Sequence, residues 1–167
     1  MSDTRSWRPR PWCSPLQEDW IDFNGHLRDA FYVLLASRAV DDLMDQLGLD
    51  AAYRAATGGT LYTLEMHVHF LREVKRDDVV TVTTRPLAAD AKRLQARCEI
   101  GCPRLEGPAA VVEMLLLHVR QQPAPKSAPF PDEVAGRVAA WLACDAATGG
   151  EHGSRVIAMR PPGPPAA

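Results

Sequence analysis

The sequence is poor in cysteine, and its few cysteines form no recognisable motif. Its 167 residues include 4 cysteines, namely Cys13, Cys98, Cys102 and Cys144, with no CxxC pair and no Cys/His cluster. This scatter argues against a disulfide framework and against a structural zinc site. The N-terminus also lacks the apolar core of a signal peptide. We therefore expect reduced thiols and a cytoplasmic location.

A charge excess of one sign and a long apolar run are missing as well. The 19 basic and 21 acidic residues give a formal net charge of -2. No apolar run approaches the roughly 20 residues that cross a bilayer. We therefore expect neither nucleic acid nor a membrane as a partner. A content of 46% hydrophobic and 24% charged residues is typical of a single globular domain of this length.

The most apolar stretch early in the chain predicts a central helix. It begins near Ala30, extends over about 19 residues and ends at Gly48, a residue that commonly terminates helices. Positions 30–36 are apolar on nearly all sides of the predicted helix. A sheet that covered only one side would leave many of these side chains in water. The sequence therefore predicts a helix that other elements wrap around, and not one that lies on an open split sheet.

Four later segments alternate between apolar and polar residues with the period of two that is typical of strands. They begin near Tyr62, Val79 and Arg93, and the last one covers residues 109–121. Polar turns between them predict antiparallel neighbours. The last segment is apolar on both faces, which favours a central or interface position. With a short strand before the helix, this is an α+β fold in which a curved antiparallel sheet wraps around a central helix.

The ends of the chain differ in composition from this body. Four prolines after residue 122 predict a linker, and Asp132-Glu133 is typical of a helix start. The last residues lack the hydrophobicity to pack. We expect an N-terminal arm at 1–12, the main domain at 13–122, a proline-rich linker with a C-terminal helix at 123–145, and a flexible tail at 146–167.

The segment Asp22-Phe23-Asn24-Gly25-His26 directly precedes the predicted helix. The first amides of a helix lack internal partners and attract negative charge. A carbonyl that gains negative charge during attack would be held there by N–H groups near Gly25 and His26. Asp22 would act as a general base or as a nucleophile. The structural alternative is that Asp22 and Asn24 only cap the helix and that Asn-Gly only forms a turn.

The run Trp20-Ile-Asp22-Phe-Asn24-Gly25-His26-Leu-Arg-Asp29-Ala-Phe-Tyr32 resembles a family signature, Asp-x-Asn-x-His-(Val/Met)-Asn-Asn-x-x-Tyr. This signature belongs to the hotdog-fold acyl-CoA thioesterases, which include the 4-hydroxybenzoyl-CoA thioesterase-like enzymes. The resemblance covers roughly residues 10–121. It implies a hotdog fold and thioester hydrolysis, with Asp22, Asn24 and His26 as catalytic residues and Gly25 and Tyr32 positioning the oxyanion. The sequence departs from the signature at Arg28-Asp29, where the family usually has two asparagines.

The same resemblance implies further site residues and partners. It implies a homodimer or homotetramer with its sites at the subunit interface, and coenzyme A as part of the substrate with no other cofactor. Glu65 and Glu73 are candidates for a second carboxylate. His67 and His69 have no third ligand to complete a metal site, so no metal is expected. The candidates for binding the phosphates of coenzyme A are Arg72, Lys75, Arg76, Lys92 and Arg93.

A narrower resemblance concerns the acyl group. The run from Glu18 through Asp41-Asp42-Leu43 to Gly48-Leu49-Asp50 is similar to the thioesterases of bacterial carnitine breakdown, which act on betainyl-CoA. A quaternary ammonium group would need an aromatic box, for which Trp12, Trp20, Phe23, Tyr32 and Tyr62 are candidates. Two rival functions are a noncatalytic acyl-CoA-binding or sensing dimer, and a hotdog enoyl-CoA hydratase, whose motif spaces Asp and His five apart.

Overall fold

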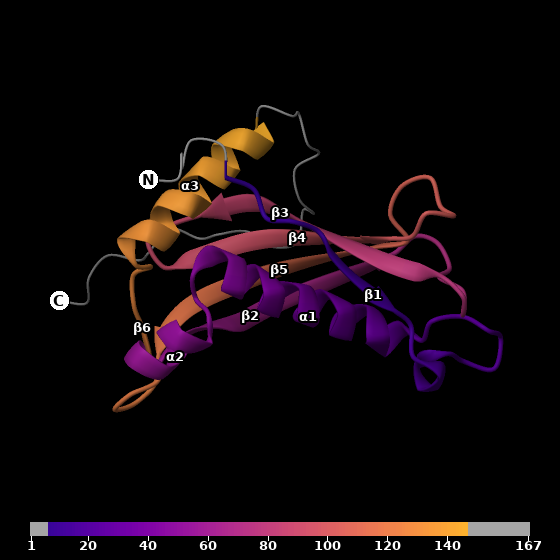
Figure 1. Ribbon diagram of the computed structural model, residues 1–167, viewed down its shortest axis with the longest axis horizontal. Coiled ribbons are helices and arrows are strands. Elements are labelled where there is room, and N and C mark those ends of the chain that lie inside the picture. The colour runs from indigo at the N-terminus through magenta and orange to yellow at the C-terminus, as the bar shows by residue number, and fades with distance from the viewer. Residues whose placement is uncertain (1–6, 147–167) are drawn as a thin grey trace.

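A single antiparallel sheet forms the body of the computed structural model, which describes residues 7–146 (Figure 1). Almost all of the predicted tail and half of the predicted arm lie outside these residues. The strands are β1 (Trp12–Pro15), β2 (Gly59–Phe70), β3 (Val79–Ala89), β4 (Arg93–Gly101), β5 (Ala110–Arg120) and β6 (Lys126–Ser127). Their order is β1-β3-β4-β5-β2, and β6 pairs with the end of β5. The sheet curls, as the sequence predicts.

The long helix α1 (Asp29–Leu47) lies along one face of this sheet (Figure 1). It ends at Gly48, whose positive φ of 93° places it in the left-handed region that favours glycine. Leu35 and Leu47 on α1 have no exposed area, and they belong to one core with Leu94 and Leu116 of the sheet. The predicted central helix and curved antiparallel sheet are confirmed. No helix of the described chain is long and apolar enough to cross a membrane.

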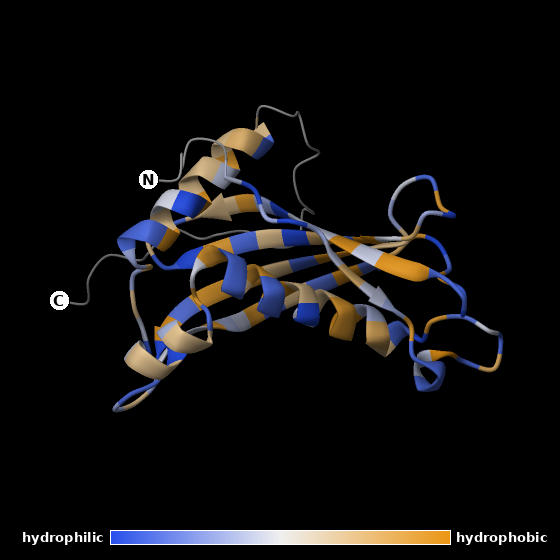
Figure 2. Cartoon of the chain, viewed as in Figure 1, coloured by the Kyte–Doolittle hydropathy of each residue, from blue (hydrophilic) through white to orange (hydrophobic). Residues whose placement is uncertain are grey.

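The N-terminal half of α1 is less enclosed than its composition predicts. Phe31, Val33 and Leu34 are only half-buried, and Ala30 is exposed. Figure 2 shows hydrophobic colour on this half of the helix even on the side that faces the viewer, whereas the C-terminal half is hydrophilic there. The sheet curls around the helix as predicted, but the chain does not bury this half of it on as many sides as its composition led us to expect. One sheet covers one side of a helix, and the remaining apolar side chains stay partly in water.

The two strands of the β2–β5 pair differ in their surroundings. β5 lies between β4 and β2, and its residues from Val111 to Leu116 are all buried, which confirms the predicted central position. β2 lies at the edge of the sheet and exposes Leu64 and Phe70, with fractions of 53% and 55%. A bulge between Thr63 and Glu65 shifts the pairing along this strand. An exposed edge of this length is a ready template for another strand.

The remaining helices and the short strand β6 were only partly expected. The predicted C-terminal helix is α3 (Asp132–Ala146), which buries Val134, Val138 and Trp141. The short helix α2 (Ala51–Thr57) begins at Asp50, whose carboxylate accepts from the Tyr53 N–H at 2.8 Å. A single-turn 3-10 helix, η2 (Glu18–Trp20), precedes the Asp22 loop. Neither α2 nor β6 was expected, although Asp50 and Gly58 mark the two ends of α2.

Candidate active site

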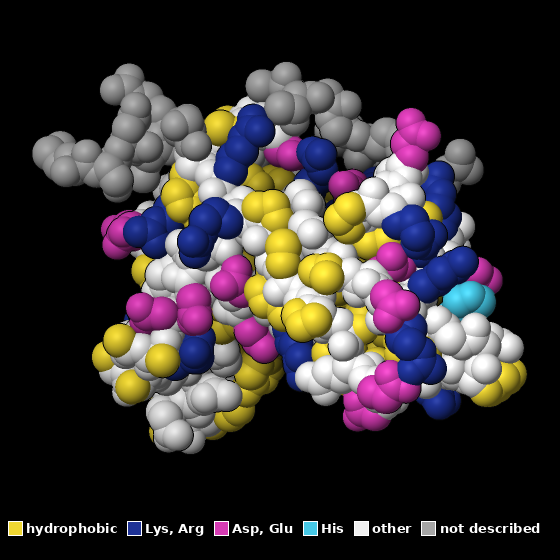
Figure 3. Space-filling model, turned by 45° about the vertical axis from the view of Figure 1, so that its right-hand side comes forward, with side chains coloured by type: hydrophobic (Ala, Val, Ile, Leu, Met, Phe, Trp, Pro, Cys, Tyr) yellow, Lys and Arg dark blue, Asp and Glu magenta, His cyan; other side chains and the backbone are white. Residues whose placement is uncertain are grey.

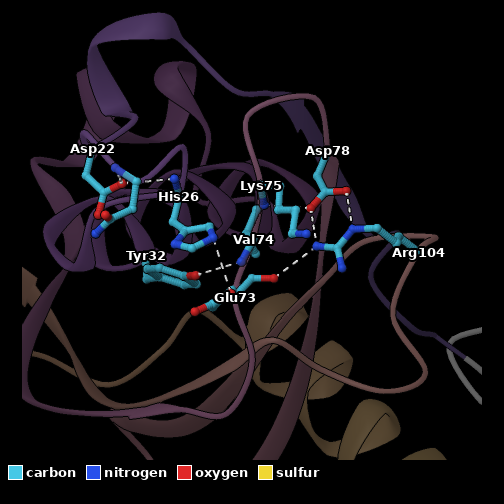
Figure 4. Close-up of polar contacts among 9 residues, drawn as sticks. Asp22, His26, Tyr32, Glu73, Val74, Lys75, Asp78 and Arg104 are labelled. Carbon is cyan, nitrogen blue, oxygen red and sulfur yellow. Dashed lines mark hydrogen bonds and ion pairs between the residues drawn. The ribbon is translucent and has the colours of Figure 1, made fainter.

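The Asp22 loop is a tight turn held together by Asp22 itself (Figure 4). Asp22 Oδ1 accepts hydrogen bonds from the N–H groups of Asn24, at 2.8 Å, and of His26, at 3.0 Å. The Asp22 carbonyl accepts from the Gly25 N–H at 3.0 Å. Gly25 has a φ of 79°, a conformation that costs a residue with a side chain free energy. Gly25 is therefore needed to close the turn.

These hydrogen bonds keep Asp22 ionised. The His26 N–H is the main cause of a lowered Asp22 pKa, and the Asn24 N–H adds to it, while desolvation acts in the opposite direction. Oδ2 of Asp22 has no hydrogen bond among the described residues, so this oxygen is available to water or to a substrate. A fixed, ionised carboxylate with one oxygen free suits either a general base or a nucleophile.

The predicted backbone oxyanion donors are not available in this arrangement. The N–H groups of both Gly25 and His26 donate to Asp22, through its carbonyl and its carboxylate. The carboxylate holds the His26 amide because it carries a full negative charge, and the Gly25 amide closes the turn onto the Asp22 carbonyl. The expectation that they hold the substrate carbonyl is therefore wrong. Other groups have to supply those donors.

Two side chains near the loop can do so. His26 Nε2 lies 3.2 Å from Glu73 Oε2 (Figure 4). The Tyr32 hydroxyl accepts from the Val74 N–H at 3.3 Å, which leaves its own proton to donate. Burial is the main cause of a raised Tyr32 pKa, so the phenol stays protonated at neutral pH. The imidazole and the hydroxyl thus face the same space.

A cavity of about 300 Å³ opens beside these groups. Its walls are formed by the start of α1 and by the end of β2, and Asp29, Phe70 and Leu71 contribute to them. The Tyr32 and Phe70 rings meet edge to face with their centroids 5.3 Å apart. Because β2 is the edge strand, the cavity lies at the edge of the sheet. In Figure 3 acidic and basic side chains lie next to each other on the surface, with no extended field of one sign.

The turn that carries Glu73 is fixed by a pair that the sequence did not indicate. Arg104 donates to Asp78 Oδ2 at 2.7 Å and to the Glu73 carbonyl at 3.0 Å. Asp78 Oδ2 also accepts from the Lys75 N–H at 2.8 Å. The Arg104 side chain is the main cause of a lowered Asp78 pKa. Arg104 lies far from this turn in sequence, so only the folded chain brings the pair together.

The predicted catalytic residues come together in part. His26, Tyr32 and Glu73 line the cavity, Asp22 joins them through its hydrogen bond from the His26 N–H, and Asn24 contributes its backbone N–H to the loop. Glu65 is not among them. It lies on the outer face of β2, where its Oε1 is 3.1 Å from His67 Nε2. Of the two candidate second carboxylates, the single chain brings only Glu73 to the site.

The predicted phosphate-binding residues do not form one group. Arg72, Lys75 and Arg76 lie in the turn before β3, whereas Lys92 and Arg93 lie beyond its other end. The 11 residues of β3 separate these two turns by about 36 Å. Arg93 is also paired with Asp90. Within one chain, the two sets cannot grip the same coenzyme A molecule.

The predicted aromatic box is also divided. Tyr32 lines the cavity, but Trp20 is buried between Phe31, stacked at 5.3 Å, and Arg38, which lies 5.0 Å from its ring centre. The Phe23 ring is 93% exposed. Trp12 and Tyr62 are in β1 and in the first part of β2, and neither lines the cavity. Phe70, which the sequence did not single out, takes the place beside Tyr32.

A comparison with known protein families agrees with the fold and with the loop that precedes the central helix. A model of the Thioesterase-like superfamily matches residues 16–142, and the chain belongs to this superfamily. It is a thioesterase with the hotdog architecture.

Two relatives narrow the comparison. The chain is 44% identical over 149 residues to the betainyl-CoA thioesterase of Pseudomonas aeruginosa. This match covers 89% of this chain and 93% of that protein. It is 43% identical over 100 residues to the L-carnitine dehydrogenase/betainyl-CoA thioesterase of Agrobacterium fabrum, a match to 60% of this chain and 20% of that protein.

Two solved structures are similar over most of the chain. A protein from Pseudomonas putida superposes with a TM-score of 0.75 and 36% identity, covering 91% of this chain and 96% of that one. A Staphylococcus aureus protein in complex with CoA has a TM-score of 0.76 and 26% identity, covering 85% of this chain and 89% of that one.

Proposed function

We propose that the protein hydrolyses betainyl-CoA, releasing coenzyme A and a trimethylammonium carboxylate. The observation that carries this proposal is the 44% identity to a betainyl-CoA thioesterase along nearly the whole of both chains. The cavity beside His26 supports it chemically, because it combines carboxylates with aromatic rings. A betainyl group needs both, since it carries a positive charge but no N–H donor.

The acyl group lies in the cavity between α1 and β2. A quaternary ammonium cannot form an N–H hydrogen bond, so it is recognised by opposite charge and by aromatic faces. Glu73 and Asp29 supply the negative charge, and Tyr32 and Phe70 supply the rings. A neutral acyl group of the same shape would gain only the apolar contact.

The site residues then divide the reaction between them. Asp22 activates a water molecule or attacks the thioester carbonyl itself through Oδ2, the oxygen that the loop leaves free. The Tyr32 hydroxyl stabilises the oxyanion, and the doubly protonated His26 imidazole does so through Nδ1–H, because its Nε2–H donates to Glu73. Glu73 orients the imidazole through the 3.2 Å contact with Nε2.

The protein acts as a homodimer in which β2 pairs with β2 of a second copy. This strand is a sheet edge of 12 residues, long for an unpaired edge, and it exposes Leu64 and Phe70, with Leu71 exposed directly after it. Antiparallel pairing about a two-fold axis would use the same strand from both copies. The cavity lies at this edge, so the partner subunit would complete its wall.

Thiol release from a panel of acyl-CoA esters tests the substrate. The panel compares betainyl-CoA with 3,3-dimethylbutyryl-CoA, which has the same shape without the charge, and with butyryl-CoA and benzoyl-CoA. We expect kcat/KM for betainyl-CoA to exceed that for the neutral isostere at least about tenfold, in line with a desolvated cation beside carboxylates and aromatic rings. Asp22→Asn serves as the inactive control.

Each outcome of this panel separates two alternatives. Equal turnover of the charged ester and its isostere would leave a thioesterase but refute the betainyl preference. Absence of thiol release from every ester, by a protein that still binds coenzyme A, would refute catalysis and favour the acyl-CoA-binding dimer.

A substitution that introduces a positive charge at the middle of the edge strand β2 tests whether the dimer forms there. Leu64→Lys places two ammonium groups close together across the two-fold axis, so we expect dissociation to monomers in analytical ultracentrifugation. Val79→Lys is the matched control, because Val79 is 52% exposed but lies on β3, away from this edge. A dimer that persists in Leu64→Lys at micromolar protein would contradict pairing through β2.

A further inference from the structure

The hairpin formed by the end of β5 and by β6 carries two cations without nearby compensation. Arg120 and Lys126 are direct cross-strand partners, and both are exposed. Like charges that face each other on neighbouring strands destabilise a sheet unless an anion or an acid lies between them. Neither side chain forms an ion pair among the described residues. No Asp or Glu occurs in residues 114–131.

These cations border a cavity of about 530 Å³. Its remaining wall is mostly apolar and includes Pro123, Ala124 and Pro125. The hairpin is firmly anchored, because Ala128 both donates to the His118 carbonyl at 3.0 Å and accepts from its imidazole at 2.9 Å. A fixed, largely apolar wall with two unneutralised cations suits a phosphate attached to a flat apolar group.

From these observations we infer that Arg120 and Lys126 bind the nucleotide phosphates of the acyl-CoA substrate, and that they do so for the active site of the partner subunit. The inference rests on the proposed function and on the proposed β2 pairing. It assigns the phosphate grip to residues outside the Arg72-to-Arg76 turn.

The geometry of the sheet shows that Arg120 and Lys126 cannot bind a substrate in the active site of their own chain. Arg120 is opposite Gly59 at one end of β2, and the cavity beside His26 lies past Phe70 at the other end. The 12 residues of β2 place these ends about 36 Å apart. Figure 1 shows β6 at one end of the molecule and the loop that precedes α1, drawn in indigo, at the opposite end. One coenzyme A molecule does not span that distance.

Antiparallel pairing of two β2 strands removes this separation. A two-fold axis near the middle of β2 places Gly59 of the partner subunit beside Phe70. Arg120 of the partner subunit is then only one strand further away, about 5 Å from Gly59 of the partner subunit. Arg120 also shares its face of β5 with Leu116 and His118, the face on which α1 lies, because alternate residues of a strand point the same way.

The kinetic test compares two substrates that share an acyl group. We expect Arg120→Gln/Lys126→Gln to raise KM for betainyl-CoA at least about tenfold with kcat nearly unchanged, since each lost phosphate contact removes a charge-assisted hydrogen bond. The same variant should hydrolyse betainyl-pantetheine, which lacks the nucleotide, at the wild-type kcat/KM. Arg10→Gln, which also removes an exposed positive charge, is the matched control and should change neither substrate.

Mixed dimers test whether the phosphates are bound by the partner. A dimer of one Asp22→Asn chain and one Arg120→Gln/Lys126→Gln chain contains one site with an intact Asp22 and an intact phosphate grip from the other chain. We therefore expect that co-refolding the two variants restores about half of the wild-type kcat/KM for betainyl-CoA per mixed dimer, measured at low substrate. If both groups acted within one chain, no mixed dimer would hold a complete site and the low-substrate activity would not rise.

The outcomes separate this inference from the proposed function. Wild-type turnover with an unchanged KM in the double variant would overturn the phosphate site and leave the thioesterase standing. Absence of wild-type turnover on every ester would instead overturn the proposed function. A raised KM without recovery in mixed dimers would refute binding by the partner subunit.

Discussion

Two histidines, one at each end of the sheet, show how differently the same side chain is used. His118 has no exposed area, and both of its ring nitrogens are bonded within the fold, to the Tyr53 hydroxyl at 2.9 Å and to the Ala128 carbonyl at 2.9 Å. His26 is partly exposed at a cavity, and its contact is with Glu73, a side chain that is itself 68% exposed.

The difference lies in what each imidazole has left to offer. A buried polar group with all its partners inside the protein contributes to stability and specifies one packing. A group at a cavity keeps one ring nitrogen available for a ligand. We therefore assign His118 to the architecture of the far end and His26 to the chemistry, and variants at the two ends should separate stability from turnover.

The largest effect is expected at the carboxylate of the site end. Asp22→Asn keeps an oxygen that can accept the His26 and Asn24 amides, so the loop should persist. It removes the charge that activates water or attacks the thioester, and we expect kcat to fall about a thousandfold with an unchanged melting temperature. Near-normal turnover in this variant would remove Asp22 from the mechanism.

The acid limb of the wild-type pH profile provides a second check on Asp22. Its lowered pKa means that the carboxylate is still mostly ionised at the ordinary aspartate value of 3.8. We expect any decline of activity that follows Asp22 protonation to have its midpoint below that value.

The next effect distinguishes the imidazole from its backbone. Because the His26 N–H is already bonded to Asp22, only the side chain can donate to the substrate. His26→Ala should therefore lower kcat about a hundredfold, the usual loss for one oxyanion donor, with little change in the melting temperature. A loss of threefold or less would show that the imidazole does not act on the carbonyl.

The matching change at the far end should do the reverse. His118→Ala leaves the Tyr53 hydroxyl and the Ala128 carbonyl without their partner and opens a cavity, so we expect unfolding to become easier by about 3 kcal/mol. Urea unfolding followed by circular dichroism measures this. Turnover per folded molecule at saturating substrate should remain near that of the wild type, and a hundredfold loss of kcat there would break the division between the two ends.

The smallest effect concerns the turn that carries Glu73. Arg104→Gln removes the main cause of the lowered Asp78 pKa, and it should lower the melting temperature only slightly at pH 7, because solvent screens the pair of an exposed arginine. A carboxylate with a lowered pKa contributes stability above its unfolded pKa and loses it as the pH falls. The difference in melting temperature between wild type and variant should therefore shrink below pH 3.8. A difference independent of pH would mean that the arginine acts through packing alone.

Much of the architecture followed from local patterns. The helix that ends at Gly48, the strands with a period of two and the central position of β5 were all predicted, because burial of apolar side chains imposes their periodicity on the sequence. The loop around Asp22 was predicted as well, since Gly25 and the helix start constrain a short continuous segment. Its catalytic role remains a prediction.

What the patterns could not supply was the environment of each group. The bulge near Thr63 adds one residue to an otherwise regular alternation, and a period of two cannot reveal it. The use of the Gly25 and His26 amides by Asp22 depends on three-dimensional competition between acceptors. The placement of Lys92 and Arg93 far from Arg72 follows from the path of β3, which a list of basic residues does not contain.

The sequence by itself determined the class of fold, the central helix and the candidate carboxylate, because each is written in a continuous run of residues. Only the tertiary structure decided that Glu73 and not Glu65 meets His26, that Arg104 holds the Glu73 turn, and that β2 is left as an open edge. These contacts join residues that are far apart along the chain. They depend on strand order and register, which arise when the whole sheet closes over one helix.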